Sequence, residues 1–182
     1  MLKQKQILDE TDKRLRLSNE PMTFPISKTE RNMMYDMVDY LKKSQDEEYA
    51  LAHDIRPGMG LAGPQVGINK RFFVVVHEEE EGVFKDYILI NPKIISHSEE
   101  KICASAGEGC LSVNREVDGY VPRFARVTIT GYDPDGNPVR YRGREELAIA
   151  FQHEYDHLDG ILFFDRIDPE DPFKNEDDMR VI

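Results

Sequence analysis

Strand-like segments follow one another from residue 71 to residue 143, and no helical pattern separates them. The apolar run RFFVVVH begins at Arg71, and YILINP and KIISHS follow as strands that we expect to break at Pro92. Residues 127–131 alternate apolar and polar side chains, and PDGN at 134–137 predicts a tight turn into VRYRG. Strands that are grouped, rather than alternating with helices, predict an α+β fold with antiparallel sheets.

A helical pattern stands on each side of these strands. The sequence SKTE at 27–30 is a capping box, and the methionines and aliphatic residues behind it predict a helix from about residue 28 to the mid-forties. Residues 49–55 extend this helix or add a turn, and a second helical period runs from about 145 to 158. We therefore expect one domain, residues 1–182, with antiparallel sheets packed around the C-terminal helix and a helix near the N-terminus.

Composition narrows the class of protein. Hydrophobic residues are 40% of the chain, which is enough for a core, and the net charge of −11 argues against a broad nucleic-acid-binding surface, although not against a local basic patch. No apolar run is long enough to span a bilayer and no secretory signal is visible, so we expect a cytoplasmic protein without membrane contact. Two cysteines do not suggest a disulfide framework, and the run Glu78–Glu81 predicts an exposed loop tip.

The second helical segment contains a metal-binding pattern, FQHEYDHLDG at 151–160. His153 and His157 are four residues apart, so on a helix both imidazoles lie on one face and can bind one ion. Glu154 lies at the edge of that face, where it can reach a water molecule rather than the metal. The pattern supplies two neutral ligands, and a catalytic metal usually takes a third from the protein.

The source of the third ligand separates the first two of three interpretations. An endopeptidase with this motif would take it downstream, where Asp165 and Asp168 are the near candidates, and Cys110 would then have no role. A metal-binding module without activity would close the fourth position and would not need Glu154 or Gln65. The third interpretation does not depend on the source of the ligand: the chain is related to an active metal-dependent hydrolase but has itself lost the activity. His53, His77 and His97 are expected in ordinary loop or strand-end positions.

Three stretches together resemble the signature motifs of the peptide deformylase family, in the same order and at similar separations. They are GMGLAGPQ at 58–65, which is too rich in Gly and Pro for a regular element, EGCLS at 108–112, and QHEYDHLDG at 152–160. The resemblance covers most of the chain, and the segment around 49–57 is similar to the insertion of the longer subtype of that family. Three spaced motifs are far more specific than any one of them.

The resemblance implies a hydrolase that removes the N-formyl group from the first methionine of newly made polypeptides, a step of protein biosynthesis that releases formate. It implies one divalent metal ion bound by Cys110, His153 and His157, with water in the open fourth position. Fe(II) is the native metal that the family suggests, and Zn, Ni or Co can substitute, since cysteine and histidine ligands suit several borderline metals.

The resemblance also implies catalytic roles. Glu154 takes the proton of the attacking water and later gives it to the leaving amine. The side-chain amide of Gln65 and the backbone N–H of Leu111 stabilise the negative oxygen that develops on the formyl group. Every matched catalytic position is present in this sequence.

Further positions are matched to substrate binding. The backbone of Met59 and Gly60 pairs with an extended peptide, which tolerates varied sequence after the methionine. Gly109 lets the backbone approach a ligand closely, and Ile149, one helical turn before His153, belongs to the pocket for the methionine side chain.

The remaining expectations concern supporting residues and partners. Glu108 pairs with Arg123 and steadies the Cys110 loop, and Asp156 orients a ligand imidazole; each could equally be a surface charge. Gly63 stands where the family commonly has alanine, and we expect it to loosen the loop. The family implies a transient ribosome contact, in some members through a basic C-terminal helix, but the tail after residue 168 is acidic here.

Overall fold

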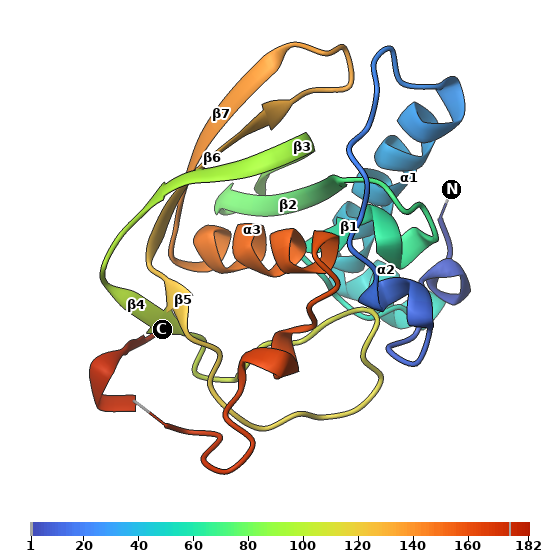
Figure 1. The fold of residues 1–182 in the computed structure, drawn as a ribbon. Helices are drawn as coiled ribbons and strands as arrows, with labels where there is room; N and C mark the ends of the chain where they lie inside the picture. The colour runs from blue at the N-terminus through green and yellow to red at the C-terminus, as the bar shows by residue number, and fades with distance from the viewer. Residues whose placement is uncertain (1, 175) are drawn as a thin grey trace.

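A five-stranded antiparallel sheet is the framework of the molecule in the computed structural model, which describes residues 2–174 and 176–182 (Figure 1). Its strand order is β1-β2-β3-β6-β7, with bounds β1 Gly60–Ala62, β2 Phe72–Glu80, β3 Val83–His97, β6 Arg126–Tyr132 and β7 Pro138–Arg144. A smaller sheet has the order β5-β4-β8, with bounds β5 Arg123–Phe124, β4 Lys101–Cys103 and β8 Arg180–Val181. The expected α+β class is confirmed, and the pairing of β4 with β8 is parallel rather than antiparallel.

Helices cover both faces of the larger sheet. Helix α1, Lys28–Ser44, begins with the predicted capping box, in which Ser27 and Glu30 bond each other's backbone N–H groups. Helix α3, Glu145–Leu158, lies inside the curve of the sheet (Figure 1). The short helix α2, Glu47–His53, follows α1 and occupies the segment that resembles an insertion. Among the described residues, no helix is long and apolar enough to cross a bilayer.

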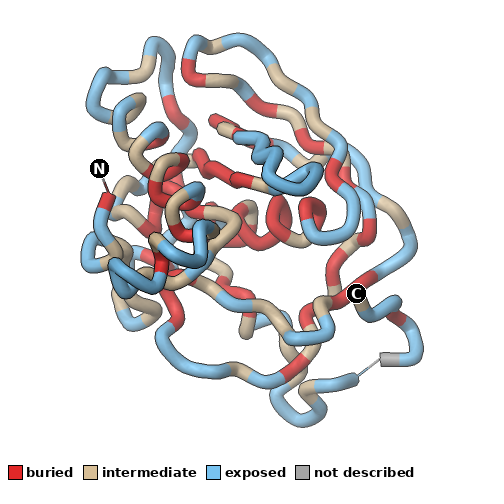
Figure 2. Tube along the Cα trace, turned by 180° about the vertical axis from the view of Figure 1, so that it is seen from behind, coloured by how far each residue is buried: buried red, intermediate tan, exposed pale blue. Residues whose placement is uncertain are grey.

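Strand β2 explains why RFFVVVH is a continuous apolar run. Side chains of a strand alternate between its two faces, and here both faces are covered. Phe72, Val74 and Val76 pack in the core beneath α1, whereas Phe73 and Val75 pack against α3. Figure 2 shows the resulting distribution, with buried residues along α3 and the central strands and exposed residues at the periphery.

The structure corrects the prediction that the chain breaks at Pro92. Strand β3 runs continuously from Val83 to His97, and its register with β6 shifts between Ile90 and Lys93. Up to Ile90 the strand pairs with β2, and from Ile90 onward it pairs with β6. A proline, which has no N–H to donate, is tolerated at such an irregularity of the ladder.

Two further predictions need correction. Of the predicted loop tip, Glu78 to Glu80 belong to β2, although these side chains are exposed as expected. The Gly- and Pro-rich stretch is regular: β1 is followed by a 3₁₀ helix, Gly63–Val66. Pairing with β2 stabilises β1, and the proline in the first turn stabilises the 3₁₀ helix. Composition shows the proline but not the pairing.

Candidate metal centre and active site

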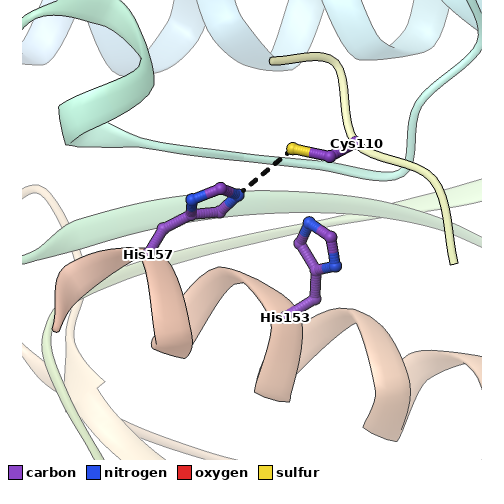
Figure 3. Close-up of side chains that lie close together, drawn as sticks. All are labelled: Cys110, His153 and His157. Carbon is purple, nitrogen blue, oxygen red and sulfur yellow. Dashed lines mark hydrogen bonds between the residues drawn. The ribbon is translucent and has the colours of Figure 1, made fainter. Parts of the chain in front are cut away.

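Helix α3 presents both histidines of the metal-binding pattern toward the same point. His153 and His157 are buried on one face of the helix, and the Cys110 side chain approaches them from the loop between β4 and β5 (Figure 3). The sulfur of Cys110 lies 3.4 Å from Nε2 of His157, and the nearest ligand atoms of the three residues all lie within 4.8 Å of one another. The three predicted ligands therefore converge on a space of the size that one metal ion requires.

A buried ion-pair network holds this arrangement. Arg123 donates to the Glu108 carboxylate at 2.7 and 2.9 Å and to Asp156 at 2.6 Å, and all three side chains are at most 7% exposed. Nδ1 of His153 lies 2.8 Å from Glu108, so donation of its N–H there leaves Nε2 with a free lone pair. The Glu108–Arg123 pair agrees with our expectation. The expected role of Asp156 is wrong, because its oxygens accept from Arg123 and Arg166 and Glu108 bonds the imidazole instead.

The charges of the network explain the titration of its members. Burial disfavours the ionised form of Glu108 and so raises its pKa. The positive charge and hydrogen bonds of Arg123 outweigh this effect and lower the pKa of Glu108 to about 2. Burial, with a smaller contribution from the positive charge of Arg123, holds the pKa of His157 well below its ordinary value, so this ring is neutral. A neutral imidazole is the form that binds metals.

The donor set fits a divalent metal of intermediate softness. One thiol sulfur and two imidazole nitrogens suit Zn, Co, Ni and Fe(II) better than the hard cations Mg and Ca. Nε2 of His157 lies 3.4 Å from the sulfur, and donation from Nδ1 of His153 to Glu108 leaves the other nitrogen of that ring able to bind an ion beside the sulfur. Among the described residues this is the sole cluster of three potential ligands with such spacing.

Glu154 lies beside the cluster with one oxygen unsatisfied. Its side chain is 3% exposed, and Oε2 has no hydrogen-bond partner among the described residues. Burial raises the pKa of Glu154 to about 7, against a smaller opposing effect of His153. Gly60 makes room for this carboxylate, because a Cβ at residue 60 would lie 2.4 Å from Oε1. The first glycine-rich motif therefore has a direct structural relation to the metal-binding helix.

Gln65 is oriented by hydrogen bonds at both ends of its amide. Its Oε1 accepts from the backbone N–H of Ala62 at 2.8 Å, so its NH₂ group points toward the cluster. That group donates to Ser112 Oγ at 3.1 Å and lies 3.4 Å from the Cys110 sulfur. Ser112, which sequence reasoning did not single out, therefore fixes the direction in which Gln65 presents its donors.

Gly63 is part of the same turn, and the expectation that glycine loosens it is not supported. The residue is buried in the 3₁₀ helix, and its carbonyl accepts from the N–H of Ile68 at 2.9 Å. A Cβ at this position would lie 2.6 Å from the ring of Phe72 and 2.8 Å from the carbonyl oxygen of Lys70. In this chain, glycine permits close packing there.

A cavity of about 550 Å³ opens beside the cluster. Its walls include Cys110, His153 and Glu154, together with every residue that we matched to substrate binding, namely Met59, Gly60, Gly109 and Ile149. Leu111 also lines the cavity, whereas Gln65 and His157 are buried behind its wall. Strand β1 is an edge strand of the large sheet, so one of its edges remains available for pairing with another chain.

Arg56 supports the cavity wall and was missed by sequence reasoning. Its guanidinium donates to the carbonyl oxygens of Leu111 at 2.6 Å and Val113 at 2.7 Å. The residue precedes β1, and the contact spans 55 positions of sequence, so no local pattern could have revealed it. Charge-assisted hydrogen bonds to two carbonyls of one loop restrict its conformation, and the loop carries the Leu111 N–H.

If the Leu111 N–H is a donor to the oxyanion, Arg56→Gln should lower kcat of the metal-loaded protein by about tenfold while metal content stays unchanged, because a loosely held donor stabilises less charge. Arg56→Lys should restore part of the rate, since an ammonium group can still donate to one carbonyl. Arg115→Gln is the matched control, because Arg115 pairs with Glu10 on the surface. A rise in KM with unchanged kcat would assign Arg56 to substrate binding instead.

Comparisons with known proteins agree with this geometry. The family model for polypeptide deformylase matches residues 4–173. The chain is 46% identical to peptide deformylase 2 of Geobacillus stearothermophilus over 97% of this chain and 96% of that protein, and 49% identical to peptide deformylase of Shouchella clausii over 96% of each. The crystal structure of peptide deformylase from Thermotoga maritima has a TM-score of 0.69 and 32% identity, covering 90% of this chain and 97% of that one. The chain therefore belongs to the polypeptide deformylase family.

Proposed function

We propose that this chain, acting as a single catalytic domain, hydrolyses the formamide bond of N-formylmethionine at the start of newly made polypeptides. The observation that carries the proposal is the convergence of Cys110, His153 and His157 beside the buried carboxylate of Glu154, at the wall of a cavity. We expect Cys110, His153 and His157 to hold one divalent ion, which supplies a Lewis acid and makes water acidic enough to react near neutral pH. Family resemblance favours Fe(II) as the native ion, and Zn, Ni or Co fit the same donors.

Glu154 is the proposed proton carrier. The oxygen of the attacking water bonds to the formyl carbon, and Glu154 takes the proton that the water gives up. The bond between that carbon and the methionine nitrogen then breaks, Glu154 returns the proton to this nitrogen to give a free amine, and the formic acid that leaves loses its remaining acidic proton to water and becomes formate. The unsatisfied Oε2 and the raised pKa of Glu154 support this role, because a carboxyl group whose pKa is close to neutral pH can both accept and release a proton.

Gln65 and Leu111 are the proposed donors to the oxyanion. The amide of Gln65 already points toward the cluster, and Arg56 restrains the loop that carries the Leu111 N–H. Donors that are fixed before reaction stabilise developing charge without the cost of reorganisation. Ser112 contributes indirectly by accepting from Gln65.

The cavity provides the proposed substrate site. A peptide added along the available edge of β1, at Met59 and Gly60, would be held by main-chain hydrogen bonds that read no side chains. Ile149 and Gly109 line the adjoining space, which would receive the methionine side chain. Such a site recognises the first residue and tolerates variation after it. Newly made chains are met in the cytoplasm at the ribosome, which is where we propose that the enzyme acts, through transient contact.

The endopeptidase interpretation has less support. Its candidate third ligands are engaged elsewhere, since Asp165 pairs with Arg16 and Asp168 pairs with Lys174 at 2.8 Å. Neither belongs to the cluster of potential ligands found among the described residues. Cys110, in contrast, occupies the position that completes the set.

Formate release tests the proposal. Protein loaded with Fe(II) without oxygen, or with Ni, should release formate from a formyl-Met peptide, and the acetyl-Met analogue should be hydrolysed at least about 100-fold more slowly, since a site fitted to the smallest acyl group excludes the extra methyl. Protein that holds one metal per chain but releases no formate would contradict the proposal. Cleavage inside an unformylated peptide would favour the endopeptidase.

A further inference from the structure

A basic surface lies on the outer face of strands β3, β6 and β7, and we propose that it binds the phosphate backbone of RNA. We call it the basic face and define it by its bases and hydroxyls: Lys93, Arg126, Arg140, Arg142, Arg144, Ser96, Thr128 and Thr130. The chain has 35 acidic and only 24 basic residues, so a surface that gathers five basic side chains is unusual for it and suggests an anionic ligand. Net charge argued against a broad nucleic-acid surface, but not against a local one.

Strand alternation places the arginines together. In β7, Val139 and Tyr141 pack against the core on the α3 side, so Arg140, Arg142 and Arg144 are directed to the opposite side and are exposed. Residues directly opposite in an antiparallel pair share a face. The register therefore adds rows across the sheet: Arg140 with Thr130 and Lys93, Arg142 with Thr128 and Ser96, and Arg144 with Arg126.

These positive charges are mostly uncompensated. Arg126 pairs with Glu100 at 2.7 Å, but no ion pair joins Lys93, Arg140, Arg142 or Arg144 to a carboxylate among the residues that the structure describes. Arg126 and Arg144 stand directly opposite each other, and Glu100 offsets the charge of Arg126 only in part, since like charges in this position destabilise a sheet. An anionic ligand bound between the two guanidinium groups would attract both of them and offset their mutual repulsion.

The chemistry of the face suits phosphates better than a folded protein. A hollow of about 260 Å³ is lined by Arg126, Arg142 and Arg144 together with Ser96 and Thr128. Guanidinium forks and hydroxyls are donors that match phosphate oxygens. Within these three rows there is no aromatic or aliphatic anchor of the kind that dominates protein–protein interfaces, and the one exposed aromatic residue of β6, Tyr132, stands beyond them, opposite Pro138. Arginines two apart on an extended strand repeat at roughly 7 Å, so the face can follow a chain of regularly spaced charges.

The choice of RNA among polyanions rests on the proposed function. A newly made polypeptide is still attached to a ribosome, a particle whose surface is largely RNA. The basic face also lies away from the catalytic cavity. Helix α3, which supplies His153 and Glu154 to the cavity wall, packs on one side of the sheet (Figure 1), and strand alternation directs the arginines of β7 to the other side. RNA held there would leave the cavity open to the substrate.

Fluorescence anisotropy with a labelled oligouridine tests the inference on the metal-loaded full chain. Affinity should fall roughly tenfold or more between about 50 and about 200 mM salt, because three or more phosphate contacts release counterions. Arg140→Glu, Arg142→Glu and Arg144→Glu together should lower affinity at least about tenfold. Formyl-Met peptide turnover should stay unchanged in this variant, which shows that it is folded. Glutamate keeps the edge of β7 charged, so the edge remains protected from association.

The matched control reverses three exposed bases elsewhere, Lys5→Glu, Lys13→Glu and Lys101→Glu, and changes the net charge by the same amount. Equal loss of affinity in both variants would reduce the effect to net charge and overturn the inference. No binding by the wild type at the lower salt concentration would overturn it as well. So would displacement of the RNA by poly-glutamate at equal charge, which would identify an acidic protein surface as the partner. RNA binding without formate release would contradict the proposed function alone.

Discussion

Glu154→Gln should reduce turnover of a formyl-Met peptide by at least about 100-fold while the protein still holds close to one metal per chain, because the proposed role of Glu154 is proton transfer and loss of a positioned proton carrier removes a large catalytic factor. Glutamine keeps the shape of the side chain but cannot accept the proton of the attacking water. Formate release and metal analysis of the same preparation measure the two effects. Loss of metal would make Glu154 a ligand, and near-normal turnover would remove it from proton transfer.

Two control variants sharpen this result. Glu146→Gln changes an exposed carboxylate at the wall of the same cavity and should leave turnover within a few-fold of normal. Cys110→Ala should have the opposite signature to Glu154→Gln, with metal content falling during dialysis against a weak chelator, because one of three protein ligands is gone. Full metal content in Cys110→Ala would exclude its sulfur from the metal site.

Arg123→Met should lower the free energy of unfolding by about 3–5 kcal/mol, because it leaves two buried carboxylates, Glu108 and Asp156, without their shared cation. Urea unfolding of the metal-free proteins near neutral pH measures this cost without a contribution from metal binding. Arg166→Met is the matched control. Arg166 pairs with the same Asp156, but its side chain is 41% exposed, so we expect a cost of about 1 kcal/mol or less. An equal loss of unfolding free energy in the two variants would contradict the role of Arg123 as the shared cation of Glu108 and Asp156.

The effect of Arg123→Met should also depend on pH. In the wild type, the lowered pKa of Glu108 stabilises the fold fully above the ordinary value of 4.5, and this contribution is lost as pH falls through about 2. Without Arg123, Glu108 is still buried but has lost the cation that stabilised its ionised form, so its pKa in the folded protein rises. The folded variant therefore binds a proton at Glu108 at a higher pH than the wild type does. The difference in stability between variant and wild type should therefore narrow as pH falls from neutrality toward acid.

Local patterns predicted the helices well and the strands less well. Helix α1 begins at its capping box, and α3 covers the predicted period from Glu145 to Leu158, because caps and periodicity act within a few residues. Strand β3 passes through Pro92 because tertiary pairing with β2 and β6 overrides a local breaker. Strands β4, β5 and β8 have two or three residues each, which is too short for an alternating pattern to be visible.

The candidate site divides in the same way. His153, Glu154 and His157 follow from spacing on one helix, whereas Cys110 entered only through family resemblance, because its proximity to His157 spans 47 positions. Arg56 and Ser112 act through contacts between distant segments and left no sequence signal. Asp156 was assigned to an imidazole because it neighbours His157 in sequence, but helix geometry directs its carboxylate to Arg123.

The contact between Gly60 and Glu154 affects how this chain tolerates mutation. Gly60 has no side chain, and it stands so close to the proposed proton carrier that even a methyl group would displace the carboxylate of Glu154. A scan of all substitutions would therefore report Gly60 among the positions most damaging to activity, although it takes no part in bond making or breaking. A list of the essential residues of such an enzyme therefore includes positions that matter because they leave room for a reactive group, and not only the residues that react.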